Sequence, residues 1–189
     1  MASILGFRRW ETSRSSFEAL VRPHLEHLYR LAWRLSGNAA DAEDLVQELL
    51  LKLYQRREEL AAIDAPRPWM ARVLYRQFVD AVRRRGRAPA IEDVDGSALE
   101  GVPDPAQGPE ELAERGQIQK RLLWALGQLN PEQRALVALH DVEGYTLEEL
   151  VTVLEAPLGT LKSRLHRARE RLRALFPMEP SSRRQRVTG

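Results

Sequence analysis

One stretch in the middle of the chain constrains the fold more than any other. From Ala88 to Glu114 there is no Lys or Arg, while eight acidic residues, four prolines and three glycines occur, and apolar periodicity is missing. Such a composition is typical of a linker rather than of a packed element. We therefore predict two folded units, residues 15–87 and 113–177, joined by an acidic flexible linker over residues 88–112. Residues 1–14 form an N-terminal extension, and residues 178–189 a disordered basic tail.

The composition excludes several classes of protein. The 189 residues contain no cysteine, which removes disulfides, Cys-ligated zinc, iron–sulfur clusters and thiol catalysis. His24 and His27 form only a weak metal motif and are read as partly buried helix residues, so no metal or cofactor is expected. No phosphate-binding loop or nucleophile elbow occurs, so we expect no enzyme, no catalytic residue and no small-molecule substrate. Apolar runs are too short for a membrane span, and the first ten residues have the wrong charge order for a secretory signal.

The first unit reads as three helices, and no alternating strand pattern is found anywhere, so the fold class is all-α. A helix over residues 17–36 ends at Gly37, and Asn38 caps a second helix that runs to about Arg57. The face of this second helix opposite its apolar stripe carries Asp44, Gln47, Glu48 and Leu51. An apolar side chain pointing outward among polar ones favours a protein contact over a solvated face.

The third helix, from about Pro68 to Arg85, has a basic outward stripe. Arg72, Arg76 and Arg83 recur at helical spacing, with Tyr75 beside them. This pattern suits a nucleic-acid backbone and an unstacked base, although an ordinary exposed face explains it equally well.

The second unit reads as a helix-turn-helix. Asn130 and Pro131 begin one helix, Thr146 and Glu149 form a capping box for a short one, and a tight turn leads into a basic helix from Leu158. In that geometry the last helix enters the DNA major groove, with its N-terminal part against the bases. Its polar face presents Thr160, Lys162, Ser163, Arg164, His166 and Arg167. A merely structural amphipathic helix is the alternative.

Two sets of motifs resemble a known family. Residues 42–48 (AEDLVQE), residues 51–54 (LKLY), Trp69 and Met70 eleven and ten residues before Asp80, and residues 83–85 (RRR) are similar to region 2 of sigma factors. Residues 144–150 (GYTLEEL) and 158–172 (LGTLKSRLHRARERL) are similar to region 4. With only these two regions and a short spacer, the chain resembles the extracytoplasmic-function (ECF, group IV) RNA polymerase sigma factors over about 160 residues.

The resemblance implies a role for each face. Asp44, Gln47, Glu48 and Leu51 would meet the β′ clamp coiled coil of core RNA polymerase, and the β flap would be a further contact. The −10 element would be held by Arg72, Arg76, Arg83 and Arg84, with a base captured from the melted strand. The −35 element would be read by Thr160, Lys162, Ser163, Arg164, His166 and Arg167. The acidic linker would thread the polymerase cleft and RNA exit channel. An anti-sigma factor is expected as a regulator, holding this bacterial cytoplasmic protein at the inner membrane.

Three positions depart from the family pattern, and two alternatives stay open. Arg76 stands where Asn is usual, Val151 where a small residue is usual, and Glu155 where the turn of the helix-turn-helix usually has Gly. A sigma mimic that occupies an anti-sigma factor without binding DNA would not need the two basic faces. A free-standing helix-turn-helix repressor would not explain the outward Leu51 or the acidic spacer.

Overall fold

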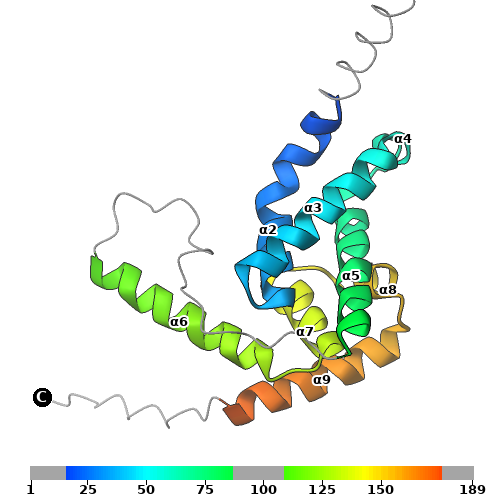
Figure 1. The fold of residues 1–189 in the computed structure, drawn as a ribbon. Coiled ribbons are helices and arrows are strands. Elements are labelled where there is room, and N and C mark those ends of the chain that lie inside the picture. The colour runs from blue at the N-terminus through cyan, green and yellow to red at the C-terminus, as the bar shows by residue number, and fades with distance from the viewer. Residues whose placement is uncertain (1–15, 87–108, 176–189) are drawn as a thin grey trace, which may run out of the picture.

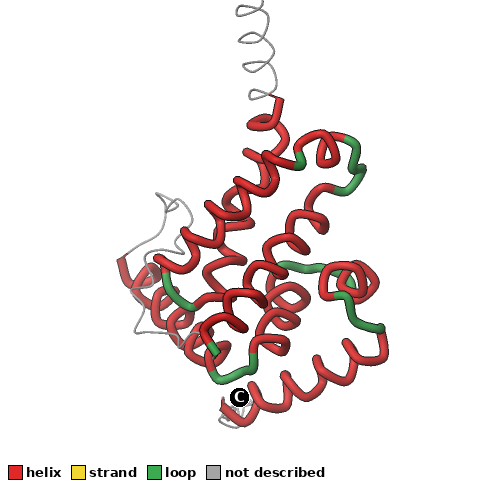
Figure 2. The backbone as a smooth tube through the Cα atoms, turned by 45° about the vertical axis from the view of Figure 1, so that its right-hand side comes forward, coloured by secondary structure: helices red, strands yellow, loops and turns green. Residues whose placement is uncertain are grey.

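The computed structural model describes residues 16–86 and 109–175, and every regular element in these ranges is a helix (Figures 1 and 2). The predicted all-α fold class is therefore confirmed. The predictions for residues 1–14 and 178–189, and for the linker up to residue 108, lie outside the described residues. Helix α6 (Pro109–Gly127) begins inside the range that we assigned to the linker, 88–112.

The first predicted helix is interrupted. Residues 16–21 are helical, a 3₁₀ turn η1 (Arg22–His24) follows, and α2 (Leu25–Ser36) continues the path. The reason is Pro23, which has no backbone N–H to donate to the preceding turn. The predicted end is confirmed, because Gly37 adopts a left-handed φ of 86° and its N–H donates to the carbonyl of Trp33.

Helices α3 (Ala39–Gln55) and α5 (Pro66–Arg85) complete the first half, with the short α4 (Arg57–Ala61) between them. The predicted cap is confirmed, because Asn38 accepts a hydrogen bond from the N–H of Asp41. The N-terminal end of α5 is Pro66 rather than Pro68, since a proline is tolerated in the first helical turn. Buried side chains of α2, α3 and α5 form the core: Leu28, Leu31, Trp33, Leu45, Leu49, Leu53, Met70, Leu74 and Phe78.

The second half contains α6, α7 (Pro131–Val137), the π-helical turn η3 (Ala138–Val142), α8 (Leu147–Leu154) and α9 (Leu158–Leu175). Asn130 caps α7 and the Thr146–Glu149 capping box opens α8, as predicted. The helix that begins at Pro131 widens into the π turn at Ala138. A helix-turn-helix formed by α8 and α9 is thus present.

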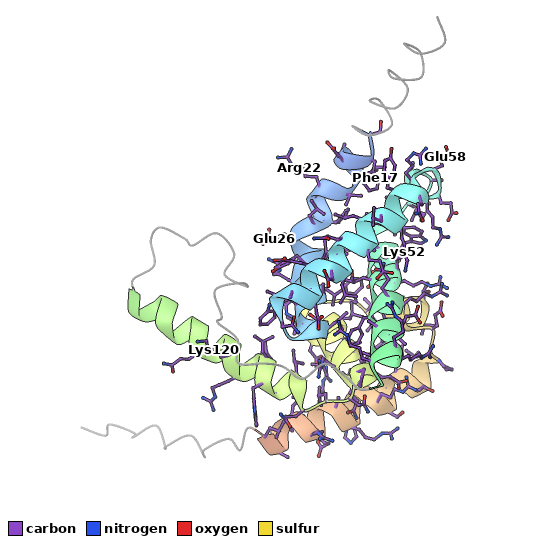
Figure 3. The ribbon with its side chains drawn as sticks, viewed as in Figure 1. Phe17, Arg22, Glu26, Lys52, Glu58 and Lys120 are labelled. Atoms are coloured by element: carbon purple, nitrogen blue, oxygen red, sulfur yellow. The ribbon has the colours of Figure 1, made fainter. Side chains whose placement is uncertain are left out.

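The two halves pack against each other. Helix α5 contacts α8, and α2 contacts both α7 and η3, so buried residues of both halves form one continuous cluster. Figure 1 shows α9 crossing beneath α5 and α7, and the side chains in Figure 3 fill the space between these helices.

Candidate nucleic-acid interface

The outward face of α3 is as exposed as the sequence predicts. Leu51 is 65% exposed, the largest value among the exposed large apolar side chains of the described residues. It borders an open, mainly apolar groove of about 830 Å³ between α3 and the helical residues 16–21, where Phe17 meets Tyr54 edge to face at 5.3 Å. Gln47 lines the same groove. This face is suited to receive a protein partner.

Two predicted sites lie side by side at the C-terminal end of α5. Asp44 and Glu48 of α3 line the same depression as Arg84 of α5. Arg85 next to it forms a two-pronged ion pair with Asp41, at 2.6 Å for both contacts, which holds α5 against α3. The hydrogen bond from Arg85 lowers the pKa of the Asp41 carboxyl below its ordinary value. The predicted polymerase face and the predicted −10 face are therefore neighbours.

The basic stripe of α5 divides into two parts. Arg83 and Arg84 are exposed. Arg72 and Arg76 instead bind the carboxylate of Glu155, which lies at the C-terminal end of α8 in the other half, with Arg72 Nε 2.9 Å from Oε1. These hydrogen bonds lower the pKa of Glu155. The stripe predicted to point outward thus faces the second half over two of its residues.

The N-terminal part of α9 presents the predicted polar face. Lys162, Ser163, His166 and Arg167 are exposed, while the opposite face buries Leu161, Leu165 and Ala168. Thr160 and Arg164 are half-buried and turn toward α5. Together with Tyr75, Arg76 and Arg83 they line a groove of about 900 Å³, in which Arg164 also pairs with Glu132 at 3.1 Å.

The turn between α8 and α9 has the left-handed conformation for which glycine is usual. Glu155 has φ 53° and ψ 42°, and it is the one non-glycine residue with positive φ in the described ranges. A side chain in this region is strained relative to glycine. Val151 is 36% exposed, so it does not belong to the packed core that joins α8 to α9.

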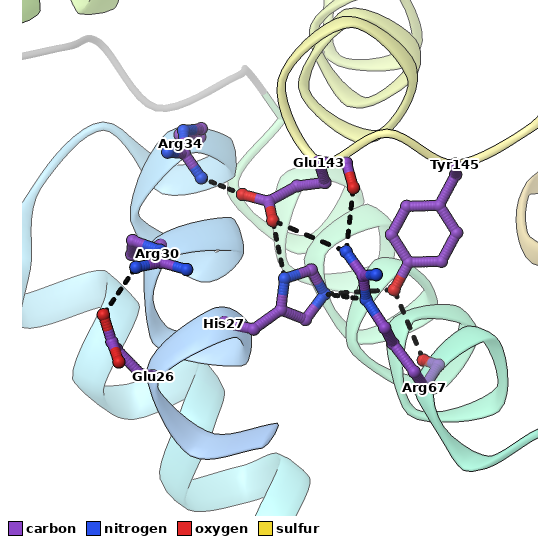
Figure 4. A network of polar contacts seen from close by, with 7 residues as sticks. All are labelled: Glu26, His27, Arg30, Arg34, Arg67, Glu143 and Tyr145. Carbon is purple, nitrogen blue, oxygen red and sulfur yellow. Dashed lines mark hydrogen bonds and ion pairs between the residues drawn. The ribbon is translucent and has the colours of Figure 1, made fainter. Parts of the chain in front are cut away.

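A buried polar cluster that sequence reasoning missed joins the two halves (Figure 4). The carboxylate of Glu143, after η3, is 6% exposed; it accepts a hydrogen bond from Nδ1 of His27 at 2.6 Å and pairs with Arg34. Arg67 donates to the Glu143 carbonyl at 2.8 Å and lies over the ring of Tyr145, whose hydroxyl is 3.0 Å from His27 Nε2.

Burial and neighbouring groups shift the pKa values of Glu143 and Tyr145 in this cluster. Burial opposes ionisation of Glu143, but the hydrogen bond from His27 and the charge of Arg34 outweigh it and lower the pKa of the carboxyl. Burial raises the pKa of Tyr145 to about 12, so its hydroxyl stays protonated. No local sequence signal could have found this cluster, because Glu143 and Tyr145 lie at least 76 residues from their partners in the first half.

Arg134 is a second buried contact between the halves that the sequence did not reveal. Its side chain is 1% exposed, and its guanidinium donates to three backbone carbonyls, those of Leu35, Leu126 and Gly127. These carbonyls stand at the C-terminal ends of α2 and α6, where helices lack internal donors and carry partial negative charge. Burial lowers the pKa of Arg134 to about 10, which still leaves it charged at neutral pH.

Over residues 16–86 and 109–175, no group of three or more His, Cys, Asp or Glu side chains is placed to hold a metal ion. Within the same ranges, no helix has both the length and the apolar character required to cross a membrane.

Comparison with known proteins matches both halves to one family. Residues 20–88 match Sigma-70 region 2, and residues 119–172 match Sigma-70, region 4. The ECF RNA polymerase sigma factor SigL of Mycobacterium tuberculosis is 34% identical over 157 residues, covering 82% of this chain and 85% of the relative. SigE of Mycolicibacterium smegmatis is 40% identical over 161 residues, which are 84% of this chain but 60% of that longer protein.

Solved structures agree with the sequence matches. The sigma factor RpoE of Bartonella quintana, solved in complex with the anti-sigma factor NepR, has a TM-score of 0.65 and 28% identity, over 87% of this chain and 98% of RpoE. The agreement of both family regions, the relatives and the fold leads to one conclusion: the chain belongs to the sigma-70 family, among its ECF sigma factors.

Proposed function

We propose that this protein is an alternative sigma factor that binds core RNA polymerase, recognises the −35 and −10 promoter elements and melts the promoter. It acts by binding, without catalytic chemistry of its own, and works in the bacterial cytoplasm. The observation that carries the proposal is that this member of the sigma-70 family has two exposed surfaces. One is an apolar side chain, Leu51, among polar residues on α3, and the other is the basic face of α9.

The α3 face is proposed to bind the β′ clamp coiled coil. Leu51 supplies exposed apolar surface, and Asp44, Gln47 and Glu48 supply polar groups around it. A central apolar anchor within a polar rim is the usual composition of an affinity-determining patch. The open groove beside Leu51 would admit side chains of a helical partner.

The basic face of α5 is proposed to hold the −10 strand. Arg72, Arg76, Arg83 and Arg84 provide phosphate contacts, and Tyr75 offers an aromatic surface beside them. Unstacking a base costs a few kcal/mol, so contacts that form only with the melted strand help to offset the opening of the duplex.

Helix α9 is proposed to read the −35 element. Its N-terminal turns carry the polar face, with Lys162 and Arg164 suited to phosphates and Arg167 to a guanine edge. Thr160, Ser163 and His166 complete the set.

Reading both elements at once requires the halves to separate. The −10 and −35 elements lie about 25 base pairs apart, which is about 85 Å along the helix axis. Here Arg76 and Arg83 of α5 line one groove with Thr160 and Arg164 of α9. The packed arrangement of the two halves is therefore a state that does not bind both elements.

An anti-sigma factor is proposed as the regulator. RpoE of Bartonella quintana is described in complex with an anti-sigma factor, and the exposed apolar face of α3 offers a surface for such a partner. Anchoring of that partner in the inner membrane would place this protein there when it is inactive.

Run-off transcription with core RNA polymerase on a promoter library tests the proposal. Wild type is expected to initiate at defined promoters. Gln47→Ala/Glu48→Ala is expected to lose core binding, whereas Gln55→Ala, exposed on the same helix, is expected to keep it. Arg167→Ala is expected to bind core but to lose −35 selectivity, and Arg173→Ala near the end of α9 is its control.

Two outcomes would contradict the proposal. A wild-type protein that never binds core would favour the sigma mimic. Binding to core without initiation at any promoter, together with unchanged DNA binding in Arg167→Ala, would remove the promoter-reading role.

A further inference from the structure

The side chain of Glu155 contacts α5 and does not stabilise the turn in which Glu155 itself lies. Glu155 lies in the turn between α8 and α9, and its left-handed backbone would suit a glycine better. Its carboxylate has no hydrogen bond to the described residues of the second half and instead reaches α5, which belongs to the first half. The turn is held by other means, because the capping box fixes the start of α8, Ala156 is buried, and Pro157 precedes α9.

The carboxylate is bound as a DNA phosphate would be bound. One oxygen, Oε1, accepts hydrogen bonds from Arg72 and from Arg76, which stand one helical turn apart on α5. Guanidinium groups also bind phosphate oxygens through charge-assisted hydrogen bonds of this kind. These two arginines belong to the set proposed above to hold the −10 strand.

We propose that Glu155 is an internal competitor for the −10 DNA: its carboxylate occupies the phosphate site formed by Arg72 and Arg76 and favours the packed state of the two halves. Single-stranded −10 DNA and Glu155 then exclude each other, so binding of the strand and separation of the halves occur together. The inference rests on the proposed function, because it takes these arginines as part of the DNA site.

The exposure of the contact fits a competitor that DNA displaces. The side chains of Arg72, Arg76 and Glu155 are 34%, 54% and 44% exposed. Exposed ion pairs contribute little, and salt weakens them further. Removing the carboxylate should therefore shift the balance between packed and separated halves by about three- to tenfold at low salt, and by less at high salt.

The test uses the full chain, without polymerase, in two measurements. The sequence has no cysteine. Glu58 on α4 (Figure 3) and Arg171 on α9 are both exposed, so Glu58→Cys and Arg171→Cys give two positions for a pair of distance labels. The first measurement is the distribution of distances between the labels. The second is the affinity for a fluorescent single-stranded DNA of about 12 nucleotides carrying a −10 sequence selected in the run-off assay.

Glu155→Gln removes the charge and nearly preserves the shape of the side chain. It is expected to enlarge the separated population and to tighten DNA binding by about three- to tenfold at low salt. Glu155→Gly, which also relieves the left-handed backbone, is expected to do the same and serves if the Gln variant is unstable. Glu148→Gln removes one charge from an exposed position of α8, the helix that precedes Glu155, and is expected to leave both measurements at wild-type values.

The arginine variants separate failure of this inference from failure of the proposed function. Arg72→Gln/Arg76→Gln should enlarge the separated population while weakening DNA binding. If these arginine changes weaken DNA binding but Glu155→Gln leaves both the distances and the affinity unchanged, Glu155 is no competitor, although the DNA site stands. If Glu155→Gln separates the halves but no variant binds the DNA, the proposed −10 site is wrong and with it the competition.

Discussion

The two halves of the molecule meet at two polar contacts, one around Glu143 and one around Glu155. Both pair a carboxylate with basic side chains, but one contact is buried and the other is exposed to solvent. They are called the buried end and the exposed end. At one end, the carboxylate of Glu143 meets His27 and Arg34 with side-chain exposures of 6%, 11% and 14%. At the other end, Glu155 meets Arg72 and Arg76, and all three are more than 30% exposed. Both regions join a carboxylate of the second half to basic side chains of the first half.

The difference shows how burial decides what an ion pair does. When one partner of a buried ion pair is removed, the other charge remains buried with neither a partner nor water around it. This is strongly destabilising. An exposed charge that loses its partner is solvated at once, and the change in free energy is small. The buried end therefore fixes how the halves pack, whereas the exposed end exchanges one anionic partner for another.

The largest expected effect is at Arg134, the most buried cation of the described residues. Arg134→Met keeps much of the volume but leaves the carbonyls of Leu35, Leu126 and Gly127 without their donor. We expect a loss of about 3 kcal/mol in the free energy of unfolding, measured by chemical denaturation. Arg173→Met, the same substitution at an exposed position, should leave the free energy of unfolding near the wild-type value. Equal stability of the two variants would show that the buried hydrogen bonds of Arg134 do not stabilise the fold.

The next effect is at Glu143. Glu143→Gln keeps the shape of the side chain but leaves Arg34 and His27 without their anion, and we expect a loss of about 2 kcal/mol at neutral pH. Glu26→Gln removes a carboxylate from an exposed pair with Arg30 on α2 and provides the matched control. A loss in Glu143→Gln no larger than in this control would contradict the distinction between buried and exposed pairs.

The same residue predicts a pH dependence. The pKa of Glu143 is lower in the folded protein than its ordinary value of 4.5. Its contribution is therefore complete above that value and is lost as the pH falls through the lower folded pKa. Stability of the wild type should fall toward that of Glu143→Gln as the solution is acidified below about pH 4.5. A constant gap between their unfolding free energies at all pH values would contradict the assignment.

A smaller effect is expected at Tyr145, which is buried at 3% exposure. Tyr145→Phe removes the hydroxyl near His27 but keeps the ring under Arg67. We expect a loss of about 1 kcal/mol in chemical denaturation. A larger loss in Tyr145→Phe than in Glu143→Gln would reverse the order that burial of charge predicts.

The smallest effect on stability is expected at the exposed end. Arg76→Gln should leave the denaturation midpoint unchanged, because the Arg76 side chain is more than half exposed and solvent replaces its partner. The same variant should weaken binding of single-stranded −10 DNA. Destabilisation comparable to that of Glu143→Gln would show that both ends are structural.

Local signals in the sequence were reliable guides to where helices begin and end. Asn38, Asn130 and Thr146 each cap the helix that they were expected to cap, because a cap depends on residues within one turn. The break at Pro23 and the π turn at Ala138 were missed. The first contradicted a clear apolar periodicity, and the second has no simple residue signature.

The sequence predicted which helix faces are exposed, but it did not predict which residues of the other half contact them. The outward Leu51 and the polar face of α9 follow from helical periodicity alone, because neither depends on a distant partner. Periodicity could not reveal that Arg72 and Arg76 meet Glu155, since the acid and the arginines stand 83 and 79 residues apart.

By itself, the sequence determined the all-α class, the helix caps and the family, because these depend on short segments and on residue type. Only the tertiary structure decided which charges are buried and which stay exposed. Arg134 and Arg76 are the same residue type on helices, yet the packing of α2, α6 and α7 encloses one and leaves the other in solvent. Burial arises from segments far apart in the chain, so the role of each charge is set by the fold and not by its neighbours in sequence.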